Sequence, residues 1–464
     1  RLRERLGLYL ERAGKPNIPG RPVALVSPHA GFRFSGQAAA YGFKALSGKR
    51  IRRVVVLGLS HRVPYRGASV PDVTHYETPL GKIPVDVSAV RRLREHPLFE
   101  NRPEVHRSEH SIEMQLPFLQ AVLGNQFKLI PITFGSLEKG DYRAAADAIR
   151  KILDQDTLIV ASSDFMHFGR RFGYRPFERS IPAGIEASDR QAIAAILSKN
   201  FDSFYGYHRR TGTTICGRVP IGVLLNLLGD SAKGRLLRYY RSGDMTGEWD
   251  GSVSYASILF TEGGGKGPLE FVGSERKTRE EAMLDPKAQS AVLALARATV
   301  ESFVRGGKAP DPDKLSAEVR KGLQVERGVF VTLRKHGHLR GCIGSIVGVE
   351  PLYKGVVGNA INSCAYDRRF KPVKPDELKD ITVEVSVLSP LRRVSDWRRI
   401  LPGWHGVVLR KGNRRSVFLP HVALEFNWEI EETLSRLAVK AGMPPDAWKS
   451  GAEFSVFEAQ IIPE

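Results

Sequence analysis

Cysteine is scarce in this chain, with only three, Cys216, Cys342 and Cys364, among 464 residues. None belongs to a CxxC pair, and a chain of this length is not a small secreted framework held by disulfides. We therefore expect a protein of a reducing interior, the cytoplasm. The sequence also lacks the run of about 18 apolar residues that a membrane-spanning helix needs. No membrane partner is expected.

Long runs of one charge are missing as well. The formal net charge is +20, yet no block of five or more consecutive Lys or Arg occurs, and no zinc-finger or RNA-binding signature is present. Nucleic acid is therefore not expected as a partner. A basic surface around a pocket would suit an anionic small molecule equally well.

Apolar residues make up 42% of the chain, and its length predicts two or three domains. The glycine-rich stretch at 263–268 is the clearest linker signal. We therefore predict a first domain over residues 1–265, a linker over 266–284 and a second domain over 285–464.

The two predicted domains differ in their apolar pattern. In the first, four short apolar runs have the length of buried strands: residues 22–26, 54–57, 127–132 and 157–161. An amphipathic helix predicted over 141–153 separates the last two. Such alternation indicates an α/β fold with a largely parallel or mixed sheet flanked by helices. In the second, residues 328–334 and 381–388 alternate with period two, which predicts an α+β domain with an antiparallel sheet.

Polar side chains follow the predicted strands of the first domain where these end. His29 follows the first strand, His61 the second, and Asp164 and His167 the last. Ligands of open α/β sheets bind at the carboxyl ends of the strands, so we expect these side chains to converge at one edge. A helix cap or a loop anchor would explain any one of them alone.

Two more segments of this domain carry titratable groups. His110 is a candidate proton shuttle, because imidazole changes its charge near neutral pH. Its neighbours Glu109 and Glu113 are interpreted as structural acids of a first helical turn. Cys216 precedes an apolar helix whose dipole is expected to lower the pKa of its thiol. A buried inert cysteine is the alternative interpretation.

In the second domain, Cys342 stands between glycines in the sequence GCIG. It is interpreted as a small residue at a close backbone approach rather than as a nucleophile. No complete catalytic triad or metal-ligand spacing is visible in this part of the chain.

The motifs of both domains resemble known families. Those of the first domain resemble the Memo-like family over about residues 20–262: PHAGFRFSG, GLSHR, EHSIEMQLPFL, SSDFMHFG and TICGRVPIGVLL. Those of the second resemble the AMMECR-type domain over about residues 285–460: GVFVTL, HLRGCIG, YDRRFKP, VEVSVLSP and FLPHVALEFNW. The whole chain resembles a fusion of two components of the AmmeMemoRadiSam system, which implies a radical SAM protein as a partner.

The Memo-like resemblance implies the fold of class III extradiol dioxygenases, which bind non-haem iron with two histidines and a carboxylate. His29 and His61 match the two histidine ligands, and Cys216 matches the third ligand position, where Memo-like proteins also have cysteine. His167 matches an acid/base histidine, and Asp164 is expected to orient His61 or His167. The implied cofactor is Fe²⁺, with copper or zinc as alternatives for a site that contains a soft thiolate.

The function implied is that of a metal-dependent oxidoreductase of the oxygenase type. It would act on a small aromatic substrate, and the AMMECR-type domain would be an accessory module. A competing hypothesis is a non-catalytic protein that keeps the dioxygenase fold and binds a peptide or partner in the same cleft, because a fold does not determine a function.

Overall fold

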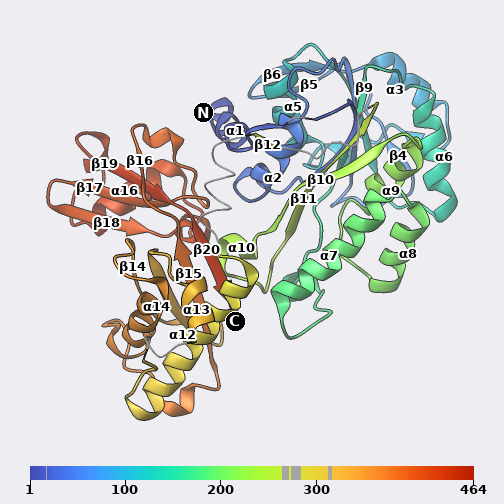
Figure 1. Ribbon diagram of the computed structural model, residues 1–464. Coiled ribbons are helices and arrows are strands. Elements are labelled where there is room, and N and C mark those ends of the chain that lie inside the picture. The colour runs from blue at the N-terminus through green and yellow to red at the C-terminus, as the bar shows by residue number, and fades with distance from the viewer. Residues whose placement is uncertain (17, 264–270, 273–283, 312–315) are drawn as a thin grey trace. The chain divides into compact units, whose positions relative to one another are not determined.

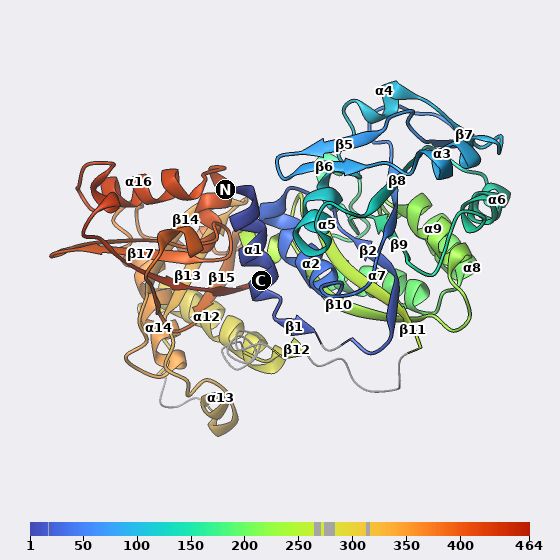
Figure 2. The same cartoon turned by 90° about the horizontal axis from the view of Figure 1, so that it is seen from above.

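The structure is a computed structural model. It describes residues 1–16, 18–263, 271–272, 284–311 and 316–464. The chain divides into two compact units, Arg1–Gly243 with Glu248–Arg276, and Asp244–Gly247 with Lys277–Glu464 (Figures 1 and 2). The linker predicted over 266–284 lies outside the described residues except for 271–272 and 284.

The first unit is built on an eight-stranded sheet with the order β10-β11-β2-β9-β3-β8-β4-β7. Its strands are β2 (Arg21–Ser27), β3 (Arg53–Leu59), β4 (Ala68–Ser69), β7 (Phe99–Glu100), β8 (Lys128–Phe134), β9 (Thr157–Ser162), β10 (Lys233–Arg241) and β11 (Ser254–Glu262). The central strands β2, β9, β3 and β8 are parallel, whereas β10, β11 and β2 pair antiparallel. The predicted mixed α/β sheet is confirmed.

Helices cover both faces of this sheet (Figure 2). They are α1 (Leu2–Arg12), α2 (Phe32–Lys44), α3 (Val87–Arg94), α4 (Pro103–His106), α5 (Leu116–Leu123), α6 (Lys139–Arg150), α7 (Ile181–Leu197), α8 (Phe201–Thr211) and α9 (Arg218–Leu227), with the short turns η1 (Glu113–Gln115) and η2 (Arg170–Phe172). Two small pairings complete the unit: β5 (His75–Thr78) with β6 (Gly81–Pro84), and β1 (Lys15–Pro16) with β12 (Phe271–Val272).

The two faces of β3 show why the central strands are apolar along their length. Val55 and Leu57 belong to a core cluster that includes residues of α6 and α9. Because side chains alternate along a strand, Val54 and Val56 face the opposite side, where α2 packs on the sheet. Burial on both faces removes the period-two pattern. Because these central strands are parallel, their carboxyl ends lie at one edge of the sheet, where the chain turns into polar loops.

Helix α6 begins two residues earlier than the sequence predicts and ends three residues earlier. Glu138 and Asp141 form a capping box: the Glu138 side chain accepts the backbone N–H of Asp141, and the Asp141 side chain accepts the backbone N–H of Glu138. This satisfies two of the unpaired N–H groups at the start of the helix, so the helix begins at Lys139.

The second unit contains two antiparallel four-stranded sheets, with the orders β14-β13-β15-β20 and β16-β19-β17-β18. The strands are β13 (Val329–Lys335), β14 (His338–Ser345), β15 (Ile381–Leu388), β16 (Arg392–Val394), β17 (Gly406–Lys411), β18 (Arg414–Phe418), β19 (Glu453–Phe457) and β20 (Ala459–Pro463). Its helices are α12 (Pro286–Gly306), α13 (Ala317–Gly322), α14 (Leu352–Ile361), α15 (Pro420–Glu425) and α16 (Ile430–Lys440), with short turns η4 (Asn362–Tyr366), η5 (Pro375–Glu377), η6 (Trp397–Arg399) and η7 (Ala447–Lys449). Helix α10 (Gly243–Thr246) spans the boundary between the units. The predicted antiparallel α+β domain is confirmed.

The glycines beside Cys342 lie at close approaches. A Cβ at Gly341 would lie 2.2 Å from the backbone oxygen of Ser363, and one at Gly344 would lie 2.2 Å from the Phe330 ring. The GCIG sequence thus allows β14 to pack tightly against its neighbours. Across the described ranges, no helix is long and apolar enough to cross a membrane.

Candidate metal centre

His29 follows β2 and lies at the carboxyl end of the sheet. Its side chain is 1% exposed, and its Nδ1 lies 2.8 Å from the Ser162 hydroxyl oxygen at the end of β9. Burial lowers the pKa of His29 to about 4, although the Asp164 carboxylate opposes this shift. Without a metal, the imidazole is therefore neutral near pH 7, the form that can bind a metal ion.

His61 follows β3 and is held by Glu109. The Glu109 carboxylate lies 2.9 Å from His61 Nδ1 and accepts the His61 backbone N–H at 2.7 Å. It also accepts the backbone N–H of Ser111. Burial alone would raise the pKa of Glu109, but these hydrogen bonds hold it down to about 2. Glu109 is therefore an ionised acid that orients a histidine. The sequence suggested only a structural role for it, in the first turn of a helix.

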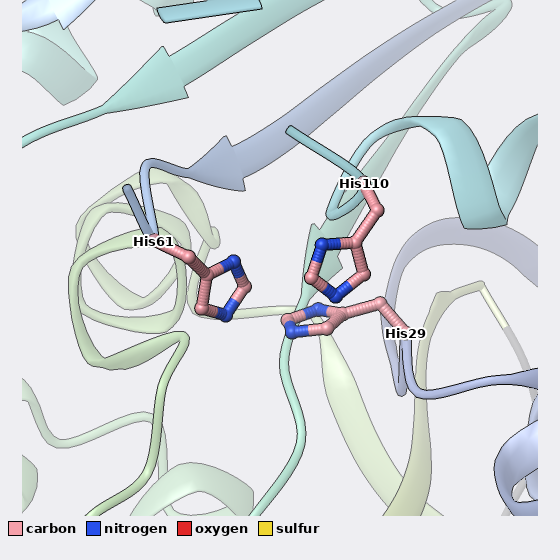
Figure 3. A group of neighbouring side chains, drawn as sticks. All are labelled: His29, His61 and His110. Atoms are coloured by element: carbon pink, nitrogen blue, oxygen red, sulfur yellow. The ribbon is translucent and has the colours of Figure 1, made fainter. Parts of the chain in front are cut away.

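His110 joins the other two histidines (Figure 3). Its ring stacks on His61, with centroids 4.8 Å apart and planes at 19°, and meets His29 edge-on at 5.5 Å. Its Nδ1 lies 3.6 Å from the Glu109 carboxylate. One ring nitrogen from each of the three histidines lies within 4.8 Å of the others. His110, predicted as a proton shuttle, is thus also placed as a potential ligand.

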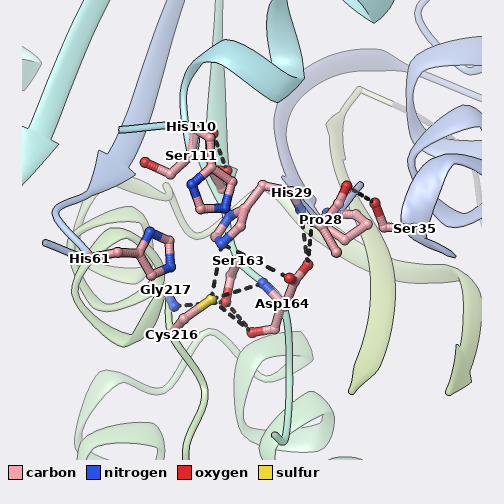
Figure 4. Close-up of polar contacts among 12 residues, drawn as sticks. Pro28, His29, Ser35, His61, His110, Ser111, Ser163, Asp164, Cys216 and Gly217 are labelled. Carbon is pink, nitrogen blue, oxygen red and sulfur yellow. Dashed lines mark hydrogen bonds and ion pairs between the residues drawn. The ribbon is translucent and has the colours of Figure 1, made fainter. Parts of the chain in front are cut away.

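Cys216 precedes α9, and its sulfur lies 3.2 Å from His29 Nε2 (Figure 4). His29, Asp164 and Cys216 form a second group whose donor atoms lie within 4.8 Å of one another. The expected lowering of the thiol pKa is wrong. Burial raises the pKa of Cys216 well above its usual value, and the nearby Asp164 carboxylate adds to the rise. Burial is the larger of these two effects.

Asp164 lies against His29 instead of His61 or His167, the two residues it was expected to orient. Its carboxylate accepts the backbone N–H groups of His29 and Ala30 at 2.9 and 3.3 Å. His167 Nδ1 lies 3.0 and 3.1 Å from the carbonyl oxygens of Phe165 and Thr214. Since carbonyls only accept, Nδ1 carries a hydrogen, and the ring is held through this atom. Neither donor group found among the described residues includes His167.

The donors fit a transition metal. Imidazole and thiolate together suit iron, copper or zinc. In both His29 and His61 the Nδ1 atom is occupied by a protein group, which leaves Nε2 for a metal, as is usual for metal-binding histidines. Bonds of roughly 2.1 Å to nitrogen and 2.3 Å to sulfur would place cis ligands about 3.1 Å apart. The observed separation of His29 Nε2 and Cys216 Sγ is 3.2 Å.

A cavity of about 200 Å³ adjoins the centre at Glu109. Its lining combines apolar, aromatic and acidic side chains: Tyr76, Glu77, His106, Glu109, Ile112, Glu113, Leu116 and Thr133. A cavity of about 150 Å³ is enough to hold one benzene ring.

The sequence did not reveal the residues that hold the histidine rings. Glu109 reaches His61 across 48 positions of the chain, and Ser162 reaches His29 across 133. The EHS sequence at Glu109 was a visible signal for a polar site, but nothing in it indicates the histidine that the acid contacts.

Comparison with known proteins identifies the family of each unit. The model of the family described as "Memo-like protein" matches residues 1–259, more than half of the chain. This chain belongs to the Memo-like family. The model described as "AMMECR1" matches residues 293–462, so the second unit carries an AMMECR1 domain.

Individual relatives each match part of the chain. The Caenorhabditis elegans protein named "Protein memo-1 homolog" is 38% identical over 276 residues, 56% of this chain and 78% of its own. "Protein Mbar_A1807" of Methanosarcina barkeri is 40% identical over 187 residues, 39% of this chain and 93% of its own. Among solved structures, uncharacterized protein PH0010 from Pyrococcus horikoshii has 33% identity and a TM-score of 0.37, covering 38% of this chain and 92% of its own.

Proposed function

We propose that the Memo-like domain is a metal-dependent oxidoreductase in which His29, His61 and Cys216 bind iron. The observation that supports the proposal is that His29 belongs to both donor groups, one with His61 and His110 and one with Asp164 and Cys216, whose sulfur lies 3.2 Å from His29 Nε2. A neutral buried imidazole and a histidine held by an ionised carboxylate are both prepared to donate to a cation. Copper and zinc are the alternatives to be separated by metal analysis.

The protein would supply proton transfer around this centre. Bound iron would supply redox chemistry and open positions for dioxygen and substrate. His110 is 46% exposed, so its ring is accessible to solvent, and its Nδ1 lies 3.6 Å from the Glu109 carboxylate. His167, whose ring is held through Nδ1, is the second proton-transfer residue of the proposal. Binding the metal requires Cys216 to lose its proton, which its raised pKa opposes until a cation is present.

We infer a small phenol-like or other aromatic substrate. The inference rests on the motifs that resemble the dioxygenase-like fold, and the cavity of about 200 Å³ beside Glu109 has room for one ring. The same inference requires a reducing compartment, since a thiolate ligand is easily oxidised. The cytoplasm meets that requirement.

Anaerobic Fe(II) titration of the full chain tests the proposal. We expect wild type to bind one equivalent and the His29→Ala/His61→Ala double variant to bind none with measurable affinity. Oxygen uptake by the iron-loaded protein is then measured with a panel of catechols and indoles. Equal iron binding by wild type and the double variant would refute the metal centre. The absence of oxygen uptake with every compound would refute the oxygenase activity.

A non-catalytic binding protein is the second candidate. His61 and His110 have side chains that are 29% and 46% exposed, so the centre reaches the surface, where a peptide side chain has access as well. Metal binding without any oxygen uptake, together with retention of a peptide on the immobilised protein, would favour this function.

The role of the AMMECR1 domain is also a proposal. We infer that it is an accessory module and that a radical SAM protein is a partner of the chain. The presence of a Memo-like and an AMMECR1 domain in one chain supports this inference. Co-purification of the full chain with the radical SAM protein of the same genome would test it, and its failure under reducing, anaerobic conditions would count against it.

A further inference from the structure

The hydroxyl of Ser162 has three partners at the end of β9. Its oxygen lies 2.6 Å from the backbone carbonyl oxygen of Ser111, 2.8 Å from Gln115 Nε2 and 2.8 Å from His29 Nδ1 (Figure 4 shows the surrounding site). All the side chains involved are buried, with exposures of 0% for Ser162 and Gln115 and 1% for His29. A hydroxyl offers one hydrogen and two lone pairs. The three partners therefore use its full capacity.

The direction of each hydrogen bond follows from this count. The Ser111 carbonyl can only accept, so it receives the single Ser162 hydrogen. The Gln115 amide nitrogen also donates to the Pro28 carbonyl at 3.0 Å, which establishes that the NH₂ group, and not the oxygen, faces Ser162. Gln115 thus donates to one lone pair of Ser162. The remaining lone pair faces His29 Nδ1, which must donate.

We propose that Ser162, with its hydroxyl held by Gln115 and Ser111, is a positioning residue that fixes the hydrogen of His29 on Nδ1. The neutral ring then carries its lone pair on Nε2, the atom that lies 3.2 Å from Cys216 Sγ. The consequence for a metal rests on the proposed function, because an Nε2 lone pair is what a cation at this position would require. The hydrogen position itself does not depend on any metal.

The tautomer of His29 is measured in the full chain without metal. Histidine-labelled ¹⁵N protein gives two-bond ¹H–¹⁵N correlations that distinguish a protonated ring nitrogen from a bare one, and His29→Gln assigns the signals. We expect wild type to show a protonated Nδ1 and a bare Nε2. Ser162→Ala should shift the population toward a protonated Nε2. Ser162→Thr, which keeps a hydroxyl, should retain the wild-type pattern.

Ser27→Ala is the matched control. Ser27 lies two residues from His29 and is fully buried, but its hydroxyl oxygen has no hydrogen-bond partner among the described residues. Removing it should leave the tautomer unchanged. Fe(II) affinity gives a second readout: we expect a loss of about 10- to 100-fold in Ser162→Ala and wild-type affinity in the control.

The outcomes separate this inference from the proposed function. A bare Nδ1 in wild type would overturn it without any variant, as would a Ser162→Ala protein with unchanged tautomer and affinity. If wild type has the expected tautomer but binds no Fe(II), the metal function fails while the hydrogen-bond assignment stands.

Discussion

Glu109 holds His61 at two points, the ring nitrogen Nδ1 at 2.9 Å and the backbone N–H at 2.7 Å. One carboxylate thereby fixes both the loop after β3 and the orientation of the ring that it carries. The same carboxylate lies 3.6 Å from His110 Nδ1. A single acid therefore organises two of the three histidines at this edge of the sheet.

Glu109→Gln removes the charge that faces both rings. We expect Fe(II) affinity to fall by about 10- to 100-fold, because groups that orient metal-binding histidines have effects of that size. Glu113→Gln is the control, since Glu113 is an exposed acid of the same segment. Calorimetric titration of both variants measures the difference. Similar affinities in the two variants would show that Glu109 has no special role.

Cys216 and His110 are expected to differ in their effect on metal binding. Cys216→Ala should lower Fe(II) affinity by about 100-fold or more, since it removes a direct ligand, whereas His110→Ala should retain binding and lose turnover. Co(II) substitution gives an independent reading, because a thiolate ligand produces a sulfur-to-metal charge-transfer band. Loss of binding in His110→Ala with the band absent in wild type would instead assign a three-histidine site.

Gly217→Ala should disturb the segment that carries Cys216. A Cβ at Gly217 would lie 2.2 Å from the Ser163 Cβ and 2.5 Å from the backbone oxygen of Ser162. Backbone atoms must therefore move, and we expect a loss of about 1–3 kcal/mol in unfolding free energy together with weaker metal binding.

The control for this variant is Gly206→Ala in α8, where an added Cβ meets no described atom within 4 Å. In the interior of a helix, alanine is more stable than glycine by about 0.5–1 kcal/mol. In urea unfolding, the free energy of unfolding should be lower than wild type for Gly217→Ala and higher than wild type for Gly206→Ala. A stabilised Gly217→Ala protein would contradict the packing at this position.

Asp189 should make the free energy of unfolding depend on pH. The residue is fully buried, and burial raises the pKa of its carboxyl to about 6, although Tyr239 and Met166 donate hydrogen bonds to it. The unfolded chain releases this proton near its ordinary pKa of 3.8, so the folded state binds more protons between these values. Stability should therefore fall by about 2 kcal/mol as pH rises from about 4 to above 6.

Asp189→Asn tests that slope, since an amide does not ionise. Relative to wild type, the variant should gain about 2 kcal/mol of unfolding free energy between pH 4 and pH 7. Chemical unfolding at several pH values gives the comparison. A difference that does not change with pH would show that the carboxyl titrates alike in the folded and unfolded chain.

Arg340→Lys tests an ion pair of the AMMECR1 domain. The Arg340 guanidinium donates to both oxygens of Glu377, at 2.8 and 3.1 Å, and to the Lys371 carbonyl, and the two paired side chains are only 15% and 13% exposed. Lysine cannot reproduce this pair of hydrogen bonds to one carboxylate, so we expect the free energy of unfolding to fall by about 1–3 kcal/mol.

Arg393→Lys provides the exposed counterpart. Arg393 pairs with Glu453 at 3.0 Å, but their side chains are 75% and 54% exposed. Exposed pairs contribute about 0–1 kcal/mol, so this variant should unfold close to wild type. Equal losses in both arginine variants, measured by urea unfolding of the full chain, would refute the distinction.

Local sequence was sufficient for the framework of the site. Apolar runs bounded by polar loops predicted the central strands, and the position of His29 and His61 just beyond strand ends placed them at one edge. This succeeds because burial on both faces leaves a direct mark on each strand. The antiparallel sheets of the AMMECR1 domain were visible in the alternating sequence of residues 381–388, although β15 is buried at every position except Thr382.

The partner of each site residue was decided by tertiary structure alone. Asp164 contacts His29 rather than His61 or His167, and Glu109 reaches His61 from 48 residues away. Hydrogen bonds between distant segments leave no periodic signal in a sequence. The pKa of Cys216 shows the same limit: its place before α9 predicted a lowered value, but burial and a neighbouring carboxylate raise it. Desolvation depends on everything that packs around an atom, which only the folded chain determines.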